Sequence, residues 1–417
     1  MPRRLFLPFT ILFILTFAST GAAAIENQGF IYGTVTTGNG KELTGFLRWD
    51  SEEAYWDDLF HSYRENITWL EDIDVELLKR EREKAYFESH GLLDRLAYVL
   101  EGGSDPDFRR VFVCRFGDLT RIDIDEEEEI TVTTTDGETH AIGGYSNDVT
   151  ADIRVYEDGL DYEEIEWDDL VSITFAQAPP EAVPYATRLF GQVRTTEGDF
   201  EGFLQWDKSE NVSTDVLDGE DESGEDQELR MGDLARIERH SKEASKVTLG
   251  DGRTLILSGT NDVNHDNRGI MVEVAGLGKV TLPWKRFKDV TFHHDRGSGQ
   301  ARADFAPQRQ LTGAVLTTDG TNLRGRLVLN FNEAWNWEIF NGTLSRMEYD
   351  LPLQRVLSIE NRGDKGSRVT LVGGRILDLN DDQDTGKDHM GLLIYNTGAG
   401  EPDYVPWRLV KSVTLDQ

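Results

Sequence analysis

Residues 31–50, IYGTVTTGNGKELTGFLRWD, decide the fold, because the chain contains this pattern twice more. Residues 189–207 read LFGQVRTTEGDFEGFLQWD, and residues 311–330 read LTGAVLTTDGTNLRGRLVLN. Each stretch alternates apolar and polar residues on both sides of a glycine-bearing turn, which predicts two antiparallel strands. Three later stretches also match one another, and these are EWDDLVSITF at 166–175, PWKRFKDVTF at 283–292 and PWRLVKSVTL at 406–415.

The spacing of these stretches predicts three tandem units. Gly191 and Gly313 are matching glycines of the second and third units and lie 122 residues apart. Other matched positions of these two units keep this spacing, so the two units align almost without gaps. The first unit aligns with them only if about 43 residues are inserted within positions 61–110. The predicted units cover residues 25–176, 188–294 and 309–417.

The sequence pattern inside a unit predicts short strands joined by turns. In the second unit, KVTL and RTLIL flank the turn Gly250-Asp251-Gly252, and a tight turn after Trp284 precedes the last strand. Each unit reads as two consecutive groups of five such strands. The insertion is the exception, because Asp74 can cap a helix that ends before Gly91. We therefore predict a mainly all-β protein with one short helical insertion in its first unit.

Each group of five strands resembles Sm-like small β-barrels. These carry a Gly, Gly, Leu, Asp signature in their first two strands, which the first unit matches at Gly40, Gly45, Leu47 and Asp50. The other units match less fully, at Gly198, Gly202, Leu204 and Asp207, and at Gly320, Gly325 and Leu327. The resemblance covers about 60 residues per group and implies a fold of two small five-stranded barrels per unit, not a function. RNA contact in Sm-like proteins needs basic and aromatic loop residues, and the sequence has no such cluster.

The first 24 residues predict a cleaved secretory signal peptide. Arg3 and Arg4 precede an apolar run at 5–18, and three alanines end at Ala24. The alternative is an uncleaved anchor, but the run is shorter than the ~20 apolar residues of a membrane span. We expect an exported protein, periplasmic or secreted, without a transmembrane segment after cleavage. Its one cysteine, Cys114, excludes an internal disulfide.

The net charge limits the partners. Asp and Glu number 77 against 43 Lys and Arg, which gives −34 at pH 7. Such a surface repels phosphate backbones and anionic lipids, so nucleic acid is excluded as a partner class. Cationic ligands and divalent metals fit the charge, and so does simple solubility or adaptation to high salt.

Loops rich in Asn and Asp recur in the second half of each unit and are candidate Ca²⁺ sites. Their carboxylate and amide oxygens are the hard ligands that Ca²⁺ takes. The alternative is that these residues cap and turn the loop by hydrogen bonding to its own backbone. The candidate ligands are Asn147, Asp148, Asn261, Asp262, Asp382, Asp384 and Asp388.

Two further patterns have structural and functional interpretations. The acidic stretch at 215–228 predicts a solvated loop. Tryptophans recur at strand ends, as at Trp49 and Trp284, where they form either core plugs or platforms for sugars. Residue types alone identify no catalytic motif. The favoured function is a non-enzymatic binding or structural role in the cell envelope, with an envelope protein or a glycan as partner. The alternatives are Ca²⁺ binding through these loops and a glycan-acting enzyme with its site near the insertion.

Overall fold

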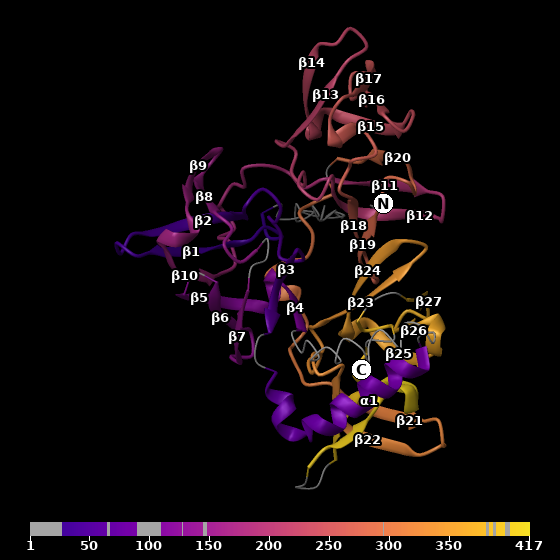
Figure 1. The fold of residues 1–417 in the computed structure, drawn as a ribbon. Coiled ribbons are helices and arrows are strands. Elements are labelled where there is room, and N and C mark those ends of the chain that lie inside the picture. The colour runs from indigo at the N-terminus through magenta and orange to yellow at the C-terminus, as the bar shows by residue number, and fades with distance from the viewer. Residues whose placement is uncertain are drawn as a thin grey trace, which may run out of the picture.

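The computed structural model describes residues 27–417 except 65–66, 90–109, 127, 145–147, 295, 381–382, 387–388 and 397–400. Strands make up 53% of it, and its helices are one α-helix and several single 3-10 turns, which confirms the mainly all-β prediction. The strands form three antiparallel sheets (Figure 1). The predicted signal peptide, residues 1–24, lies outside the described residues.

The first sheet has ten strands in the order β4-β3-β7-β6-β5-β10-β1-β2-β8-β9. Its strands are β1 (Tyr32–Thr37), β2 (Glu42–Trp49), β3 (Leu59–Arg64), β4 (Arg110–Arg115), β5 (Leu119–Glu126), β6 (Glu129–Thr134), β7 (Thr139–Gly143), β8 (Ile153–Asp158), β9 (Asp161–Ile165) and β10 (Leu170–Phe175).

The second sheet has twelve strands in the order β14-β13-β17-β16-β15-β20-β11-β12-β18-β19-β24-β23. Its strands are β11 (Phe190–Thr195), β12 (Asp199–Gln205), β13 (Val216–Glu220), β14 (Asp226–Arg230), β15 (Leu234–Arg239), β16 (Ala244–Leu249), β17 (Thr254–Ser258), β18 (Ile270–Val274), β19 (Gly278–Leu282), β20 (Phe287–Phe292), β23 (Ile339–Leu344) and β24 (Met347–Pro352).

The third sheet has eight strands in the order β27-β26-β25-β30-β21-β22-β28-β29. Its strands are β21 (Thr312–Thr317), β22 (Asn322–Leu329), β25 (Val356–Asn361), β26 (Ser367–Leu371), β27 (Ile376–Leu379), β28 (Leu392–Tyr395), β29 (Asp403–Val405) and β30 (Val410–Leu415).

The ten strands of the first sheet form two groups of five, which are nested in the chain rather than consecutive. In the first sheet, β1, β2, β8, β9 and β10 are neighbours, and β3 to β7 form the other group. The second group lies in the chain between β2 and β8, and the pair of β10 with β5 joins the two groups. The expected two consecutive barrels per unit differ from this arrangement, because β2 leads directly into the other group. A 3-10 turn, Trp167–Asp169, precedes the last strand at the expected place.

One hairpin joins the second and third sheets. Strands β23 and β24 belong by sequence to the predicted third unit, yet β24 pairs with β19 in the second sheet, with Val280 opposite Tyr349. Strand β23 touches the third sheet through one isolated bridge, from Thr343 to Asn380. The sheet boundaries therefore do not follow the predicted unit boundary.

Ion pairs bury charge where the first sheet meets the second. Arg188 binds Asp57 at 2.6 Å, and Lys279 of β19 binds Asp58 at 3.1 Å. All four side chains are at most 7% exposed. The Arg188 guanidinium also lies over the ring of Tyr55, 4.0 Å from its centroid. Opposite charges that are buried together in this way hold the two sheets in one arrangement.

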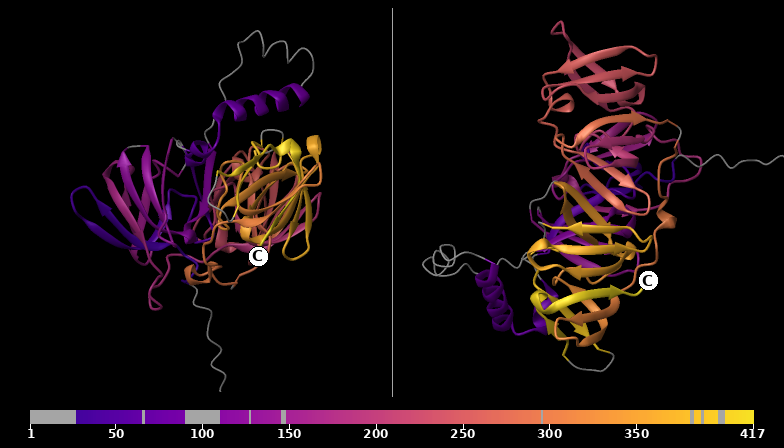
Figure 2. Two further views of the ribbon diagram at one scale, coloured as in Figure 1. Left: turned by 90° about the horizontal axis from the view of Figure 1, so that it is seen from below. Right: turned by 90° about the vertical axis from the view of Figure 1, so that its right-hand side faces the viewer.

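The insertion is the connection between β3 and β4, and its described part lies against the third sheet (Figure 2). It contains α1 (Val75–Ser89), which confirms the predicted helix. Leu78 of this helix packs into an apolar cluster with Phe331 and Met390, and Glu81 binds Arg408 at 2.6 Å. The insertion therefore ties the first sheet to the third. Among the described helices, none is both long and apolar enough to span a membrane.

The tryptophans and the acidic stretch have structural roles. Five tryptophans at the recurring strand ends are all buried, namely Trp49, Trp167, Trp206, Trp284 and Trp407, so the core interpretation holds for them. The acidic stretch at 215–228 is a β-hairpin of β13 and β14, not the expected solvated loop. Alternation explains it, because Leu217 and Gly219 face the interior while the acidic residues between them face solvent. Cys114 is buried and free.

Candidate functional site

A recurring turn after the second strand of each five-strand group builds the candidate site. Its first residue has a left-handed backbone, with φ of 47° to 51° at Asp50, Asp207 and Asn330. Asp and Asn tolerate this conformation better than other residues with side chains. The turn brings a glutamate back beside the strand end, and these glutamates are Glu53, Glu210 and Glu333.

A buried aspartate lies near each turn, and it comes from the predicted Asn/Asp loop. Its carboxylate accepts a backbone N–H of the next strand, as when Asp262 accepts from Asp218 and Asp384 accepts from Asn341, both at 2.8 Å. Asp148 accepts from His61 in the same way. These contacts explain the recurrence of Asp in the loops, because each carboxylate satisfies an otherwise unpaired strand amide. These aspartates therefore bond the backbone of another strand, and not that of their own loop as the structural alternative expected.

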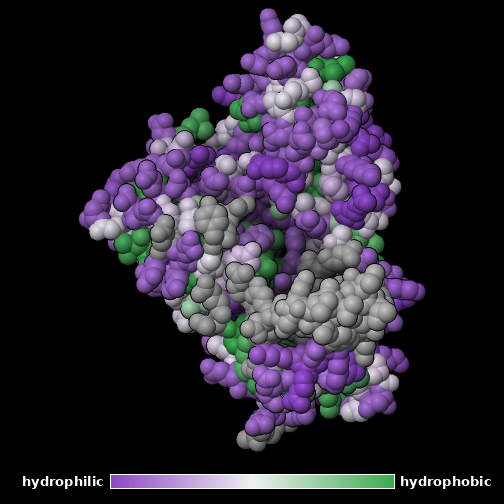
Figure 3. Space-filling view, viewed as in Figure 1, coloured by the Kyte–Doolittle hydropathy of each residue, from purple (hydrophilic) through white to green (hydrophobic). Residues whose placement is uncertain are grey.

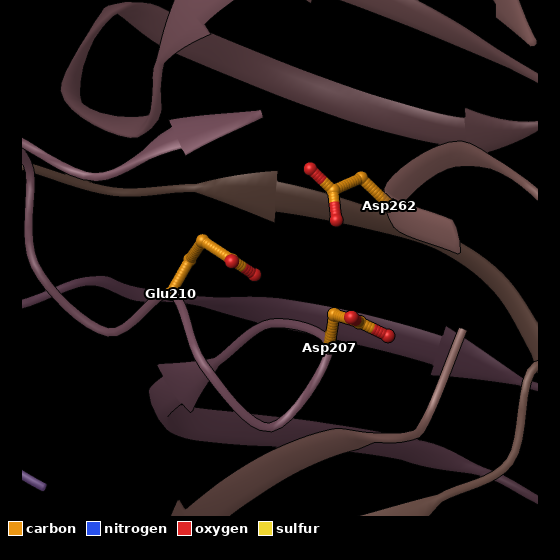
Figure 4. Close-up of side chains that lie close together, drawn as sticks. All are labelled: Asp207, Glu210 and Asp262. Atoms are coloured by element: carbon orange, nitrogen blue, oxygen red, sulfur yellow. The ribbon is translucent and has the colours of Figure 1, made fainter. Parts of the chain in front are cut away.

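Three acidic side chains converge in the second sheet. Ligand atoms of Asp207, Glu210 and Asp262 all lie within 4.8 Å of one another. Figure 4 shows the carboxylates of Glu210 and Asp262 turned toward each other, with Asp207 beside them. Asp207 is fully buried and Asp262 is 7% exposed. Among the described residues, this is the one group of acids, His or Cys with the spacing of metal ligands.

Hydrogen bonds satisfy two members of this acidic cluster. Asp207 accepts from the backbone and the Nε of Arg268 and from the amide of Asn261. Asp262 accepts the backbone N–H of Asp218. The Oε2 atom of Glu210 is buried and has no hydrogen-bond partner in the described part of the chain. One carboxylate oxygen of the acidic cluster therefore faces other acids without a donor.

The pKa values reflect this crowding. Burial and the charge of Asp262 raise the pKa of Glu210 to about 9. Burial also raises the pKa of Asp262 to about 6, although the backbone N–H of Asp218 opposes the rise. Two chemical states relieve the repulsion between the carboxylates. Glu210 either holds a proton, or a divalent cation takes its place between the oxygens.

The corresponding positions of the other sheets do not supply the same three acids. In the third sheet, the first position is Asn330, whose amide donates to Asp384 at 3.1 Å. In the first sheet, Asp50 is exposed and leaves the group. Burial nevertheless raises the pKa of both Glu53 and Glu333 well above the usual range. The complete set of three acids is thus found in the second sheet.

The seven predicted Ca²⁺ ligands do not form one site. Asp262 belongs to the acidic cluster, and Asn261 uses its amide to donate to Asp207. Asp148 and Asp384 lie in the other two sheets, and Asn147, Asp382 and Asp388 lie outside the described residues. Sequence reasoning missed Asp207 and Glu210. Their signal is the spacing of an acid or amide and a glutamate three residues later, in WDSEE, WDKSE and LNFNE at 49–53, 206–210 and 329–333.

The described helix of the insertion contacts the third sheet and not the acidic cluster of the second sheet. A small cavity of about 10 Å³ lies between the first sheet and the β23 strand, beside the ion pair of Arg64 and Glu338. That volume is about the space of one water molecule. Comparisons with protein-family models, curated proteins and solved structures give no match.

Proposed function

We propose that this chain is an exported, non-enzymatic protein with a binding or structural role in the cell envelope. The single observation that carries the proposal is the set of hydrogen bonds that the recurring aspartates make. In each sheet the loop aspartate holds a strand amide, so these side chains stabilise the fold. What the molecule then presents is its surface, which is largely hydrophilic on the face in Figure 3 and carries a net charge of −34.

The connections between the sheets support a scaffold. Strand β24, which belongs by sequence to the third unit, pairs with β19 of the second sheet. Buried ion pairs join the first and second sheets, and the insertion connects the first sheet to the third. A body connected at three places holds its surfaces at fixed relative positions, which suits contact with a large partner at more than one place.

The test uses the full chain in its own cells. Intact mass of the purified protein should show loss of about 24 residues, as expected of signal cleavage. A photo-crosslinking residue at exposed surface positions should give discrete covalent adducts in the envelope fraction. A screen of glycan and peptide substrates should show no turnover. Turnover that is lost on changing one buried carboxylate, or a chain retained in the cytoplasm, would overturn the proposal.

A second candidate function is divalent cation binding, for which we propose the acidic cluster of Asp207, Glu210 and Asp262. The observation that favours it is the unpartnered Oε2 of Glu210 within a group whose ligand atoms lie within 4.8 Å. Calcium takes six to eight oxygen ligands, so this cluster would supply part of a coordination shell that water completes. Calorimetric titration with CaCl₂ after chelation should show one site that Glu210→Gln removes. No heat, with no rise in melting temperature, would refute it.

A further inference from the structure

The edge of β19 shows how this fold adds a strand. Strand β24 pairs antiparallel with it, with Lys279 opposite Asp350, Val280 opposite Tyr349 and Thr281 opposite Glu348. All five residues of β19 are buried as a result. A hairpin from elsewhere in the chain has thus supplied the hydrogen-bond partners that an edge strand lacks.

Strand β9 is the counterpart of β19 in the first sheet, and among the described residues it ends the sheet without such a partner. Both strands lead into a turn that begins on a buried tryptophan, a 3-10 turn at Trp167 after β9 and an ordinary turn at Trp284 after β19. Counting back from these tryptophans places Tyr162 and Glu164 at the positions of Lys279 and Thr281. Figure 1 shows β9 at the outer margin of the molecule.

The side chains of β9 indicate what could pair there. Its first four residues are exposed, and Glu163 and Glu164 each have one basic partner, Lys41 and Arg154 respectively. Tyr162 is 50% exposed and the neighbouring Leu160 is 66% exposed. Large apolar side chains beside open backbone groups are a feature of sheet edges that accept a strand. Three of these four exposed residues are acidic, and this favours a strand with basic residues.

A second copy of this chain is a poor occupant. Strand β14 is the counterpart of β24 and also ends its sheet. If it paired with β9 in the register seen at β19, Asp226 would lie opposite Glu164, and Glu228 opposite Tyr162. Like charges directly opposite each other destabilise a strand pair. Charge complementarity therefore favours a different chain with lysine or arginine at alternate positions.

We propose that β9 binds an extended, basic segment of a partner protein, which adds to the first sheet as an antiparallel strand. This inference rests on the proposed binding role and names the surface and the chemistry of its partner. Backbone hydrogen bonds would supply affinity, as in other cases of strand addition. Glu163, Glu164 and the exposed ring of Tyr162 would select basic residues that carry apolar neighbours.

The test measures binding of a blocked, fluorescent peptide that alternates lysine with valine, by anisotropy at physiological salt. Reversal of both charges in Glu163→Lys/Glu164→Lys should weaken binding at least about tenfold. Glu222→Lys changes an exposed acid in a turn of the second sheet and should leave binding unchanged. The peptide methylated on alternate backbone nitrogens keeps its charge but cannot pair, so it should also bind at least about tenfold more weakly to the unaltered protein.

Equal binding of the methylated peptide would overturn strand addition, whatever the folding state of the variants. Equal weakening by Glu222→Lys would overturn the assignment to β9 and indicate general charge attraction. No binding of the lysine peptide would likewise overturn it. Adducts in the envelope fraction from another surface would still uphold the proposed function, so the two failures are distinguishable.

Discussion

The exchange of Glu210 for Gln should stabilise this protein at alkaline pH. Glutamine has the shape of a protonated glutamic acid and stays neutral. The folded pKa of Glu210 is about 9, against an ordinary value of 4.5. The folded state therefore binds this proton more tightly than the unfolded state. The contribution of Glu210 to stability is most favourable below pH 4.5 and is lost progressively as the pH rises toward 9.

The two pKa values set the size of the effect. At pH 8 the difference from 4.5 corresponds to an upper limit of about 5 kcal/mol, at 1.36 kcal/mol per pKa unit. Glu210 is only partly buried, so solvent screening lowers this limit, and we expect Glu210→Gln to gain about 1–3 kcal/mol. The gain should nearly disappear near pH 4.5, where the unaltered side chain is protonated in the folded state and half protonated in the unfolded state.

The assay is urea unfolding followed by tryptophan fluorescence, in chelator, at pH 4.5 and pH 8. Trp206 precedes the turn and reports on this region. Glu222→Gln removes an exposed charge of the same kind and should show no such pH dependence. Saturating CaCl₂ at pH 8 should stabilise the unaltered protein, by about 2.7 kcal/mol at a hundredfold excess over Kd, and not the variant. A variant no more stable than the parent at pH 8 would refute the crowding argument.

Three further changes test the same physical reasoning. Lys279→Met leaves Asp58 buried without its lysine and should destabilise the protein by about 3 kcal/mol in urea unfolding. The added change Asp58→Asn should restore much of this stability. Equal losses in the single and the double variant would contradict a buried pair. Leu78→Ala should cost about 2–4 kcal/mol and speed amide exchange in α1, and unchanged exchange would show that the helix is held otherwise. Asn330→Asp creates a third acid beside Glu333 and should lower stability in chelator and make melting respond to CaCl₂, whereas Asn330→Ser should lower stability without a calcium response.

Alternation and turn residues predicted many of the strands, because such strands bury one face locally. The turn Gly250-Asp251-Gly252 and the turn at Trp284 lie where the pattern indicated. The nesting of the two strand groups was not predictable in this way. Which strand pairs with which depends on contacts between residues far apart in the sequence, such as Ile122 and Ile173 across β5 and β10.

The sequence predicted only part of the candidate site, for a related reason. The loops rich in Asp and Asn were predicted to hold Ca²⁺ ligands, and one of these residues, Asp262, does belong to the acidic cluster. Asp207 and Glu210 looked like the end of a strand and a surface acid. Their role depends on the left-handed turn at Asp207, with φ of 50°, which folds the glutamate back against the strand. Composition cannot show that a three-residue spacing has this geometric effect.

The strands β9, β19 and β29 hold corresponding places in the three sheets, and they differ in what covers them. Strand β24 occupies β19, and Tyr404 of β29 packs against the apolar cluster that receives the insertion. Only β9 of these three presents a row of exposed side chains, and three of its first four residues are acidic. The outer strand β14 is acidic as well, at Asp226 and Glu228, so a pair of β9 with β14 of a second copy would place like charges opposite each other. The same charges that prevent this association make β9 selective for a basic strand, so resistance to self-assembly and choice of partner follow from one set of carboxylates.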